Sequence, residues 1–233
     1  MRIREENIHT ICDESNIWER LLTLDDADIL ELGCGTAELT RKIATAGANR
    51  RITAMEVDEI QHEKNLQVDD LPNVHFVVGA AEDIPAENNA YDIVLMFKSL
   101  HHVPPASMDM ALDEIRRVLK ADGRVYISEP VFSGDFNDIL RLFHDEEQVR
   151  QAAFAAVKKA VDDERFTLID EVFFFASICF ADFSEFEQKV IGVTHSHHQL
   201  SDDVYRQVRQ AFSAKMTDDG AHFLQPMRVD VLG

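Results

Sequence analysis

The fold is decided by Asp28-Ile-Leu-Glu-Leu-Gly-Cys-Gly-Thr-Ala-Glu-Leu-Thr40, a short apolar run that leads into a glycine-containing turn. Residues 28–32 have the composition of a buried strand, and apolar side chains that share one helical face follow the turn. Thr36 stands where a helix N-cap is expected. Glycine tolerates a positive φ and leaves room above the backbone, because it has no Cβ. The stretch therefore predicts a strand, a tight turn and a helix.

The same alternation continues through the first half of the chain. Strands are predicted at 51–56, 74–78, 91–97 and 125–128, and helices at 59–68 and 108–119, the second ended by Asp122-Gly123. Continuous apolar runs such as 91–97 are typical of parallel strands that are covered on both faces. We therefore predict an α/β fold, a doubly wound Rossmann-like sheet of seven mostly parallel strands with an antiparallel last strand and added lid helices.

A chain of 233 residues can bury roughly 70 to 75 % of its unfolded surface, and we expect one domain over 1–233. We expect an N-terminal helix within 1–26, a cofactor-binding core at 27–130, lid helices with strand six at 131–220, and the last strand at 221–233. Within the lid region the pattern predicts helices at 137–161, 183–191 and 201–216 and a strand at 166–175; the N-terminal helix is expected over 5–22.

Composition narrows the class of partner. The chain has 43 acidic and 23 basic side chains and a formal net charge of −20, which disfavours binding to a phosphate backbone, although a local basic surface stays compatible with it. The charged N-terminus does not resemble a secretory signal, and the longest apolar run, 172–180, is too short to cross a bilayer. We therefore expect a cytoplasmic protein without membrane insertion. Three widely spaced cysteines indicate free thiols.

The first turn is also the predicted ligand site, because open parallel sheets bind ligands at the carboxyl ends of their strands. Gly33 and Gly35 lie in this turn, and Glu56 ends the second strand, where a carboxylate can accept the hydroxyls of a ribose. Two glycines by themselves can make a simple tight turn. The strand before them, the helix after them and the acid together favour a nucleoside site.

The residues also discriminate between nucleosides. A dinucleotide site needs a third glycine or an alanine where this chain has Glu38, whose carboxylate would face a pyrophosphate. NAD is therefore the second choice. S-adenosyl-L-methionine has no phosphate, and its sulfonium and ammonium cations are attracted by acids such as Glu31.

These residues belong to a series of motifs over about 27–130 that resembles the class I S-adenosylmethionine-dependent methyltransferases, particularly the UbiE-like or type 11 group. After the opening stretch, the motifs are Ala54-Met-Glu-Val-Asp58, Val78-Gly-Ala-Ala-Glu-Asp-Ile-Pro85, Tyr91-Asp-Ile-Val-Leu-Met96 and Ile115-Arg-Arg-Val-Leu-Lys-Ala-Asp-Gly123. The chain departs from the family at Ala37, where a third glycine is usual, and at Ala80, where an acid often binds adenine.

The resemblance implies a role for each residue of the cofactor site. Gly33, Cys34 and Gly35 would line the methionine part and Glu56 would bind ribose, with Glu31 near the cation. Val57 would pack on adenine, Ala81 and Glu82 would reach its edge, and Phe97 would offer its carbonyl to the ammonium group.

Acceptor chemistry is expected at Lys98-Ser-Leu-His-His102, which follows the fourth strand where the family meets its substrate. Lys98 and His102 are the predicted substrate contacts, and His101 or His102 is the candidate base. The alternative is that one histidine packs against the lid while the other faces solvent. A second cluster, His195, His197 and His198, lacks an acid or cysteine at a familiar metal-ligand spacing, so no metal is predicted.

The sequence therefore predicts a methyltransferase that moves a methyl group from S-adenosylmethionine to a small molecule by in-line transfer. Two alternatives stay open, an RNA-modifying methyltransferase and a cofactor-binding module without catalysis. A homo-oligomer is also compatible with these residues. These residues do not identify the acceptor, the methylated atom or the pathway.

Overall fold

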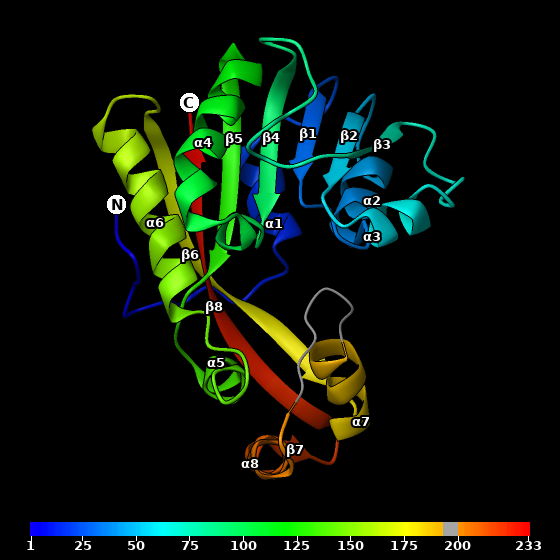
Figure 1. The fold of residues 1–233 in the computed structure, drawn as a ribbon, viewed down its shortest axis with the longest axis vertical. Coiled ribbons are helices and arrows are strands. Elements are labelled where there is room, and N and C mark those ends of the chain that lie inside the picture. The colour runs from blue at the N-terminus through cyan, green and yellow to red at the C-terminus, as the bar shows by residue number, and fades with distance from the viewer. Residues whose placement is uncertain (193–199) are drawn as a thin grey trace.

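The sheet has the strand order β3-β2-β1-β4-β5-β8-β6, with β7 paired to β8 off this path (Figure 1). The structure is a computed structural model, and it describes residues 1–192 and 200–233. Strands β1 to β5 pair in parallel, and β8 lies antiparallel between β5 and β6. The predicted α/β fold is confirmed. The strands are β1 (Asp28–Leu32), β2 (Arg51–Glu56), β3 (Val74–Val78), β4 (Tyr91–Phe97), β5 (Leu119–Pro130), β6 (Leu168–Phe180), β7 (Met216–Thr217) and β8 (Gly220–Leu232).

Helices cover both faces of the sheet. Alternate strand residues point to opposite faces, so Leu30 and Val94 pack with α4 and α6, whereas Ile29 and Leu95 pack with α1 and α2. Both core clusters are apolar, as expected for parallel strands buried on two sides. The α-helices are α1 (Ser15–Leu21), α2 (Glu38–Thr45), α3 (Glu59–Asn65), α4 (Met108–Val118), α5 (Asp135–Leu140), α6 (Glu147–Asp162), α7 (Phe183–Phe186) and α8 (Asp202–Ser213).

Strands β6 and β8 continue past the other strands and form a separate arm (Figure 1). β8 pairs with β5 over 227–232, and its pairing with β6 extends to Ala221. Helices α5, α7 and α8 pack on this arm around a third core cluster that is rich in phenylalanine. Phe180, Phe186 and Phe212 are buried there against one another. These aromatic residues therefore form core in the region predicted as the lid.

Three local predictions were wrong. The helix expected over 137–161 is divided into α5 and α6, with residues 141–146 outside both, and Glu146 immediately before α6 directs its side chain toward His101. Residues 119–124 belong to β5, since Leu119 pairs with Tyr91 across an irregular register. The N-cap of α2 is Ala37 and not Thr36, and Ala37 has a left-handed φ of 60°.

The N-terminal helix is shorter than predicted, and residues 5–14 are not helical. Ile11 forms a bridge to Phe175, whose N–H donates to the Thr10 carbonyl at 2.8 Å. The outer edge of β6 offers unpaired backbone groups that this segment satisfies. The histidine cluster at 195–198 lies outside the described residues, and the described helices include none that is long and apolar enough to cross a membrane.

Candidate active site

The glycine turn is fixed between β2 and the segment after β4. The N–H groups of Gly33 and Cys34 donate to the Met55 carbonyl at 2.9 and 3.0 Å. Gly33 has a φ of +74°, and a Cβ built on it would lie 2.7 Å from the Cβ of Ser99. Gly35 also has a positive φ, +53°, but no described atom lies within 4 Å of a Cβ placed there. The turn is therefore closely packed at Gly33 and open at Gly35.

Glu56 holds this turn at the carboxyl end of β2. Its Oε2 accepts the Gly35 N–H at 2.7 Å, and its Oε1 accepts the N–H groups of Val57 and Asp58 at 2.9 and 3.0 Å. The carboxylate is thus oriented by three backbone donors from two strand ends. Glu56, the residue predicted to bind ribose, therefore also has a structural role, because it joins the turn after β1 to the turn after β2. Val57 beside it is 66 % exposed, which leaves its side chain open to a flat apolar ligand.

Glu31 lies beneath the turn and is buried. Thr40, one turn into α2, donates its hydroxyl to Oε2 of Glu31 at 2.6 Å. Burial raises the pKa of Glu31 to about 7, and the nearby Glu56 carboxylate adds to the effect. Burial likewise holds the pKa of the Cys34 thiol above its usual range, so this thiol stays protonated. Near neutral pH Glu31 therefore exists in both protonated and ionised forms, and a cation in the turn would favour the ionised form.

The remaining predicted cofactor residues lie around the same strand ends. Ala81 and Glu82 are half-buried in a turn closed by the Asp83 N–H and the Ala80 carbonyl at 3.1 Å. Phe97 ends β4 and is buried, with its ring packed on Trp18 at a centroid distance of 5.1 Å. Trp18 is 1 % exposed and therefore belongs to the core beneath the site.

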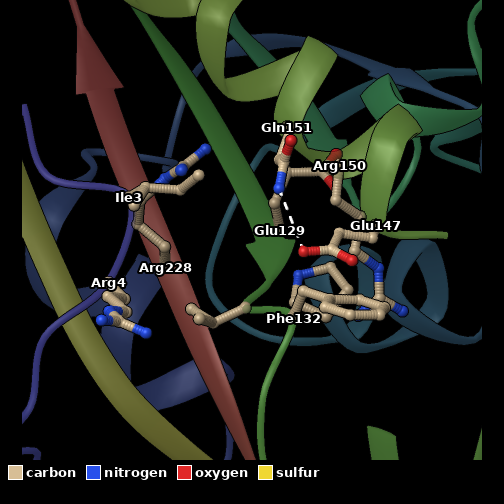
Figure 2. Close-up of a pocket in the computed structure, with 10 residues that line it drawn as sticks. Ile3, Arg4, Glu129, Phe132, Glu147, Arg150, Gln151 and Arg228 are labelled. Carbon is tan, nitrogen blue, oxygen red and sulfur yellow. Dashed lines mark hydrogen bonds between the residues drawn. The ribbon is translucent and has the colours of Figure 1, made fainter. Parts of the chain in front are cut away.

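The end of β5 adds an acid that the sequence analysis missed. Glu129 is 3 % exposed and borders a cavity of about 170 Å³ between β5, β8 and the start of α6 (Figure 2). Arg150 and Arg228 also line this cavity. Glu129 is the penultimate residue of β5, and Glu56 ends β2, so the rule that sites gather at the carboxyl ends of strands could have identified it.

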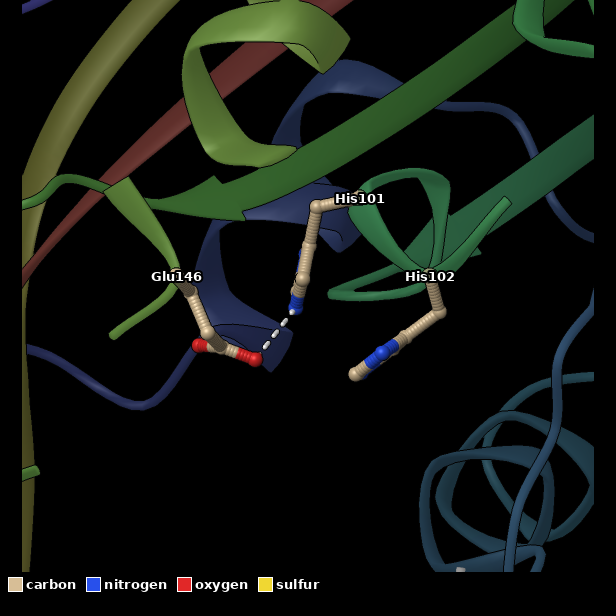
Figure 3. A group of neighbouring side chains, drawn as sticks. All are labelled: His101, His102 and Glu146. Atoms are coloured by element: carbon tan, nitrogen blue, oxygen red, sulfur yellow. Dashed lines mark ion pairs between the residues drawn. The ribbon is translucent and has the colours of Figure 1, made fainter. Parts of the chain in front are cut away.

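His101 is buried between two carboxylates. Its Nδ1 is hydrogen-bonded to Glu129, its backbone N–H donates to the same carboxylate at 3.3 Å, and its Nε2 lies 3.6 Å from Oε1 of Glu146 (Figure 3). Burial by itself lowers the pKa of His101, but the two carboxylates outweigh burial and raise it to about 9. Burial opposes the ionisation of Glu146, yet His101 and Arg150 hold its pKa below the usual range.

His102 has a different environment, although it is the next residue. It is exposed, and its ring centroid lies 4.1 Å from that of His101. Lys98, which the sequence analysis placed with the substrate, is also exposed and has a positive φ of 54° directly after β4. The two histidines thus belong to one short 3-10 helix (Leu100–His102) but present one buried and one accessible ring.

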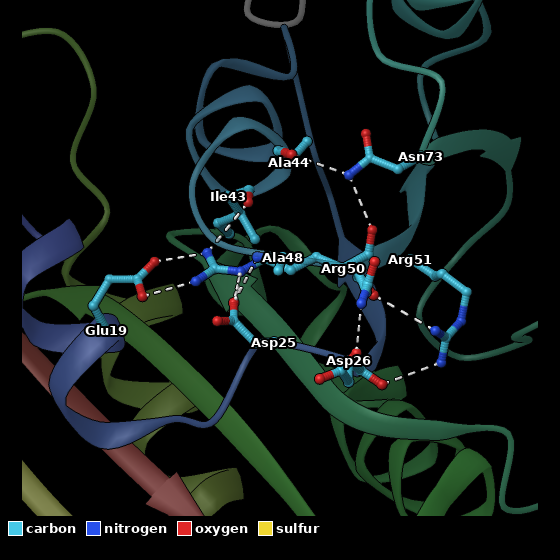
Figure 4. A network of polar contacts seen from close by, with 10 residues as sticks. Glu19, Asp25, Asp26, Ile43, Ala44, Ala48, Arg50, Arg51 and Asn73 are labelled. Atoms are coloured by element: carbon cyan, nitrogen blue, oxygen red, sulfur yellow. Dashed lines mark hydrogen bonds and ion pairs between the residues drawn. The ribbon is translucent and has the colours of Figure 1, made fainter.

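The opposite ends of β1 and β2 are braced by a buried guanidinium. Arg50 donates to both oxygens of Glu19 at 2.7 and 2.9 Å, to Asp25 at 2.9 Å and to the Ile43 carbonyl at 3.2 Å (Figure 4). This network joins α1, the segment before β1 and α2. It therefore helps to hold α1, which carries Trp18, against Phe97 of the site.

Comparison with known proteins agrees with this geometry. Residues 29–123 match the family described as a methyltransferase domain. The match includes the glycine turn, covers less than half of the chain, and agrees with the sheet order described above. The C-methyltransferase UbiE of ubiquinone and menaquinone biosynthesis from Shewanella piezotolerans is similar to this chain, with 29 % identity over 140 residues, 55 % of this chain and 54 % of that protein.

Two further proteins show how far the similarity extends. An uncharacterized methyltransferase of Mycobacterium tuberculosis is 34 % identical over 97 residues, which cover 42 % of this chain and 37 % of that protein. The chain thus spans only about a third to a half of the length of these relatives. The solved structure of the YcgJ protein of Bacillus subtilis has a TM-score of 0.60 at 16 % identity and covers 94 % of this chain and 96 % of that chain, which shows a shared fold.

Proposed function

We propose that this protein transfers a methyl group from S-adenosylmethionine to a small-molecule acceptor. The observation that carries the proposal is the joined turn of Gly35 and Glu56, which sets an oriented carboxylate beside an open backbone surface at the carboxyl ends of β1 and β2. Such a surface suits a nucleoside, because the ribose hydroxyls need a hydrogen-bond acceptor and the protein backbone must approach the ligand closely.

The predicted cofactor contacts are compatible with these positions. Residues 33–35 would line the methionine part, Glu56 would accept from the ribose, and exposed Val57 would pack on the adenine, with Ala81 and Glu82 at its edge. Phe97 would direct its carbonyl toward the ammonium group. Glu31 would contribute through its charge rather than by direct contact, since it is buried and bonded to Thr40.

S-adenosylmethionine, when bound, supplies an electrophilic methyl carbon on a sulfonium that leaves as a neutral thioether. The protein's own part is to align the acceptor atom with that bond and to keep water away, since methyl transfer is an in-line displacement. His101 has both ring nitrogens directed at carboxylates, so His102, with an exposed ring, is the better candidate to take a proton from the acceptor. Lys98 would contact an acceptor from the same segment.

We assign cofactor binding to the region 27–130, and acceptor binding to the region 131–220 together with Lys98 and His102 after β4. The two regions meet where Glu146, before α6, faces His101, after β4. A small acceptor also agrees with the net charge of −20, which opposes the approach of RNA.

Calorimetric titration of the full chain with S-adenosylmethionine tests the cofactor part of this proposal. We expect one site, and Glu56→Gln should weaken binding at least tenfold, because the amide keeps one acceptor oxygen but removes the charge and the second acceptor. Asp70→Asn, at an exposed carboxylate paired with Arg41 on the surface, is the matched control and should bind normally. A folded protein that binds no S-adenosylmethionine would refute the proposal.

Turnover is tested by following S-adenosylhomocysteine release in the presence of a panel of phenols, amines, quinols and carboxylic acids. Release that depends on one of these compounds supports catalysis. Tight binding of the methyl donor with no turnover on any compound would instead indicate a cofactor-binding module.

A further inference from the structure

Three possible metal ligands meet beside the proposed acceptor region. His101, His102 and Glu146 each direct one ligand atom into a shared space, and these atoms lie within 4.8 Å of one another (Figure 3). They come from the 3-10 helix after β4 and from the residue that precedes α6. Two imidazoles and one carboxylate form a set that binds zinc in proteins, with a fourth position left for water or substrate.

The orientation of His101 is the second, independent observation. Its Nδ1 is bonded to Glu129, whose other oxygen accepts the His101 backbone N–H at 3.3 Å. In the protein without metal, Nε2 carries a proton as well and lies 3.6 Å from Glu146. A bound ion would displace this proton, so that Nδ1 keeps its proton toward Glu129 and the Nε2 lone pair faces the ion. Metal-binding histidines in proteins usually donate their second ring N–H to a carboxylate in this way, which fixes the tautomer and the direction of the ring.

Glu146 is oriented just as firmly. Its Oε2 is paired with the Arg150 guanidinium, and its Oε1 lies 2.9 Å from Nε2 of His144. Arg150 also donates to the Asn137 side chain at 3.1 Å, so the pair is anchored on α5. Arg228 lies opposite Glu129 and donates to Asp230, so once the imidazoles are neutral in the metal-bound state, the carboxylates of Glu129, Glu146 and Asp230 outnumber the guanidinium groups of Arg150 and Arg228. The space between the histidines and Glu146 therefore attracts a cation.

We propose that Nε2 of His101, a ring nitrogen of His102 and a carboxylate oxygen of Glu146 bind one Zn²⁺ ion, with Glu129 as the residue that positions His101. The ion would connect the segment after β4 to the start of α6. This site is separate from the methyl-donor turn, and its existence does not depend on the proposed methyl transfer. With the ion bound, His102 acts as a ligand in place of the base role considered above. No sequence motif marks it, because Glu129 and Glu146 lie far along the chain from the histidines.

Zinc binding is tested on the full chain without an affinity tag, stripped of metal and titrated with Zn²⁺ in competition with a chromophoric chelator. We expect one ion per chain. His101→Ala and Glu146→Gln should each weaken binding at least tenfold, and Glu129→Gln about 10- to 100-fold, since it leaves every ligand in place. Circular dichroism establishes that each variant is folded.

The matched control uses the second histidine-rich segment of the chain. A variant with His195, His197 and His198 all replaced by alanine should retain the ion, and so should His9→Ala, which changes an exposed histidine. Substitution by Co²⁺ should give visible absorption bands of a four-coordinate N/O site, and these bands should disappear in His101→Ala.

Two results would overturn the proposal. One is the absence of stoichiometric binding at micromolar Zn²⁺ by the folded chain, in which case the cluster is an ion-pair network only. The other is binding that survives His101→Ala and is lost in the triple histidine variant. Affinity for S-adenosylmethionine is measured separately on the same samples, so failure of the zinc site is distinguishable from failure of the methyl-donor site.

Discussion

Gly33→Ala should destabilise the protein far more than Gly35→Ala, although both glycines have a positive φ in the same turn. A left-handed φ costs an alanine roughly 1 to 2 kcal/mol, and this cost applies at both positions. At Gly33 the added Cβ would also lie 2.7 Å from the Cβ of Ser99. Such overpacking typically costs about 1 to 3 kcal/mol more. We therefore expect losses of about 2 to 5 kcal/mol for Gly33→Ala and about 1 to 2 kcal/mol for Gly35→Ala.

Urea unfolding followed by circular dichroism gives both free energies, and their difference isolates the contact with Ser99 because the conformational cost cancels. Adding Ser99→Gly to Gly33→Ala should restore part of the loss, although it also removes the Ser99 hydrogen bond to the Leu32 carbonyl. Gly35→Ala, in contrast, should keep most of its stability and lose affinity for S-adenosylmethionine, since its Cβ enters open space.

Equal stabilities for Gly33→Ala and Gly35→Ala would refute the packing argument. Normal affinity of Gly35→Ala for S-adenosylmethionine would refute the placement of the cofactor on the open side of the turn. The two readouts are independent, so each conclusion can fail separately.

Three other predictions follow from buried groups away from the proposed metal ligands. Because the folded pKa of Glu31 is about 7 and its ordinary value is 4.5, the folded state keeps a proton that the unfolded chain loses, and stability should fall as the pH rises through this window. The free energy of unfolding, measured by urea titration, should fall between pH 5 and pH 8 by up to about 3 kcal/mol less in Glu31→Gln than in the unmodified protein. An equal pH dependence in the two proteins would contradict the raised pKa of Glu31. Arg50→Lys should lower the free energy of unfolding by about 1 to 3 kcal/mol, because lysine cannot donate to both oxygens of Glu19, whereas exposed Arg51→Lys should change it little; equal thermal midpoints would count against the network. Phe212→Ala should lower the free energy of unfolding of the β6–β8 arm by about 3 to 5 kcal/mol, because Phe212 is buried in its core cluster. Amide hydrogen exchange should then accelerate in α7 and α8 while β1 stays protected. Acceleration of equal size in β1 would show that the arm does not unfold independently.

The sequence by itself determined the α/β class and predicted the cofactor half of the site, which stays a prediction. Apolar runs such as 91–97 are typical of strands covered on both faces, and the order of strands and helices then restricts the topology. Gly33, Gly35 and Glu56 were recognisable because the chemistry of a nucleoside site needs these residue types at strand ends, and the structure places all three at one turn.

Only the tertiary structure decided which charged side chains surround His101 in the predicted acceptor region. His101 contacts Glu129 and Glu146 because the fold brings the ends of β4 and β5 and the start of α6 together. The hydrophobic periodicity of the sequence does not predict a contact between residues so far apart in the chain. The helix predicted over 137–161 is divided before Glu146, and residues 10–12 pair with the edge of β6 instead of forming a helix. Local patterns report which side chains must be buried. Which buried charges face one another is decided by the packing of segments that are distant in the chain.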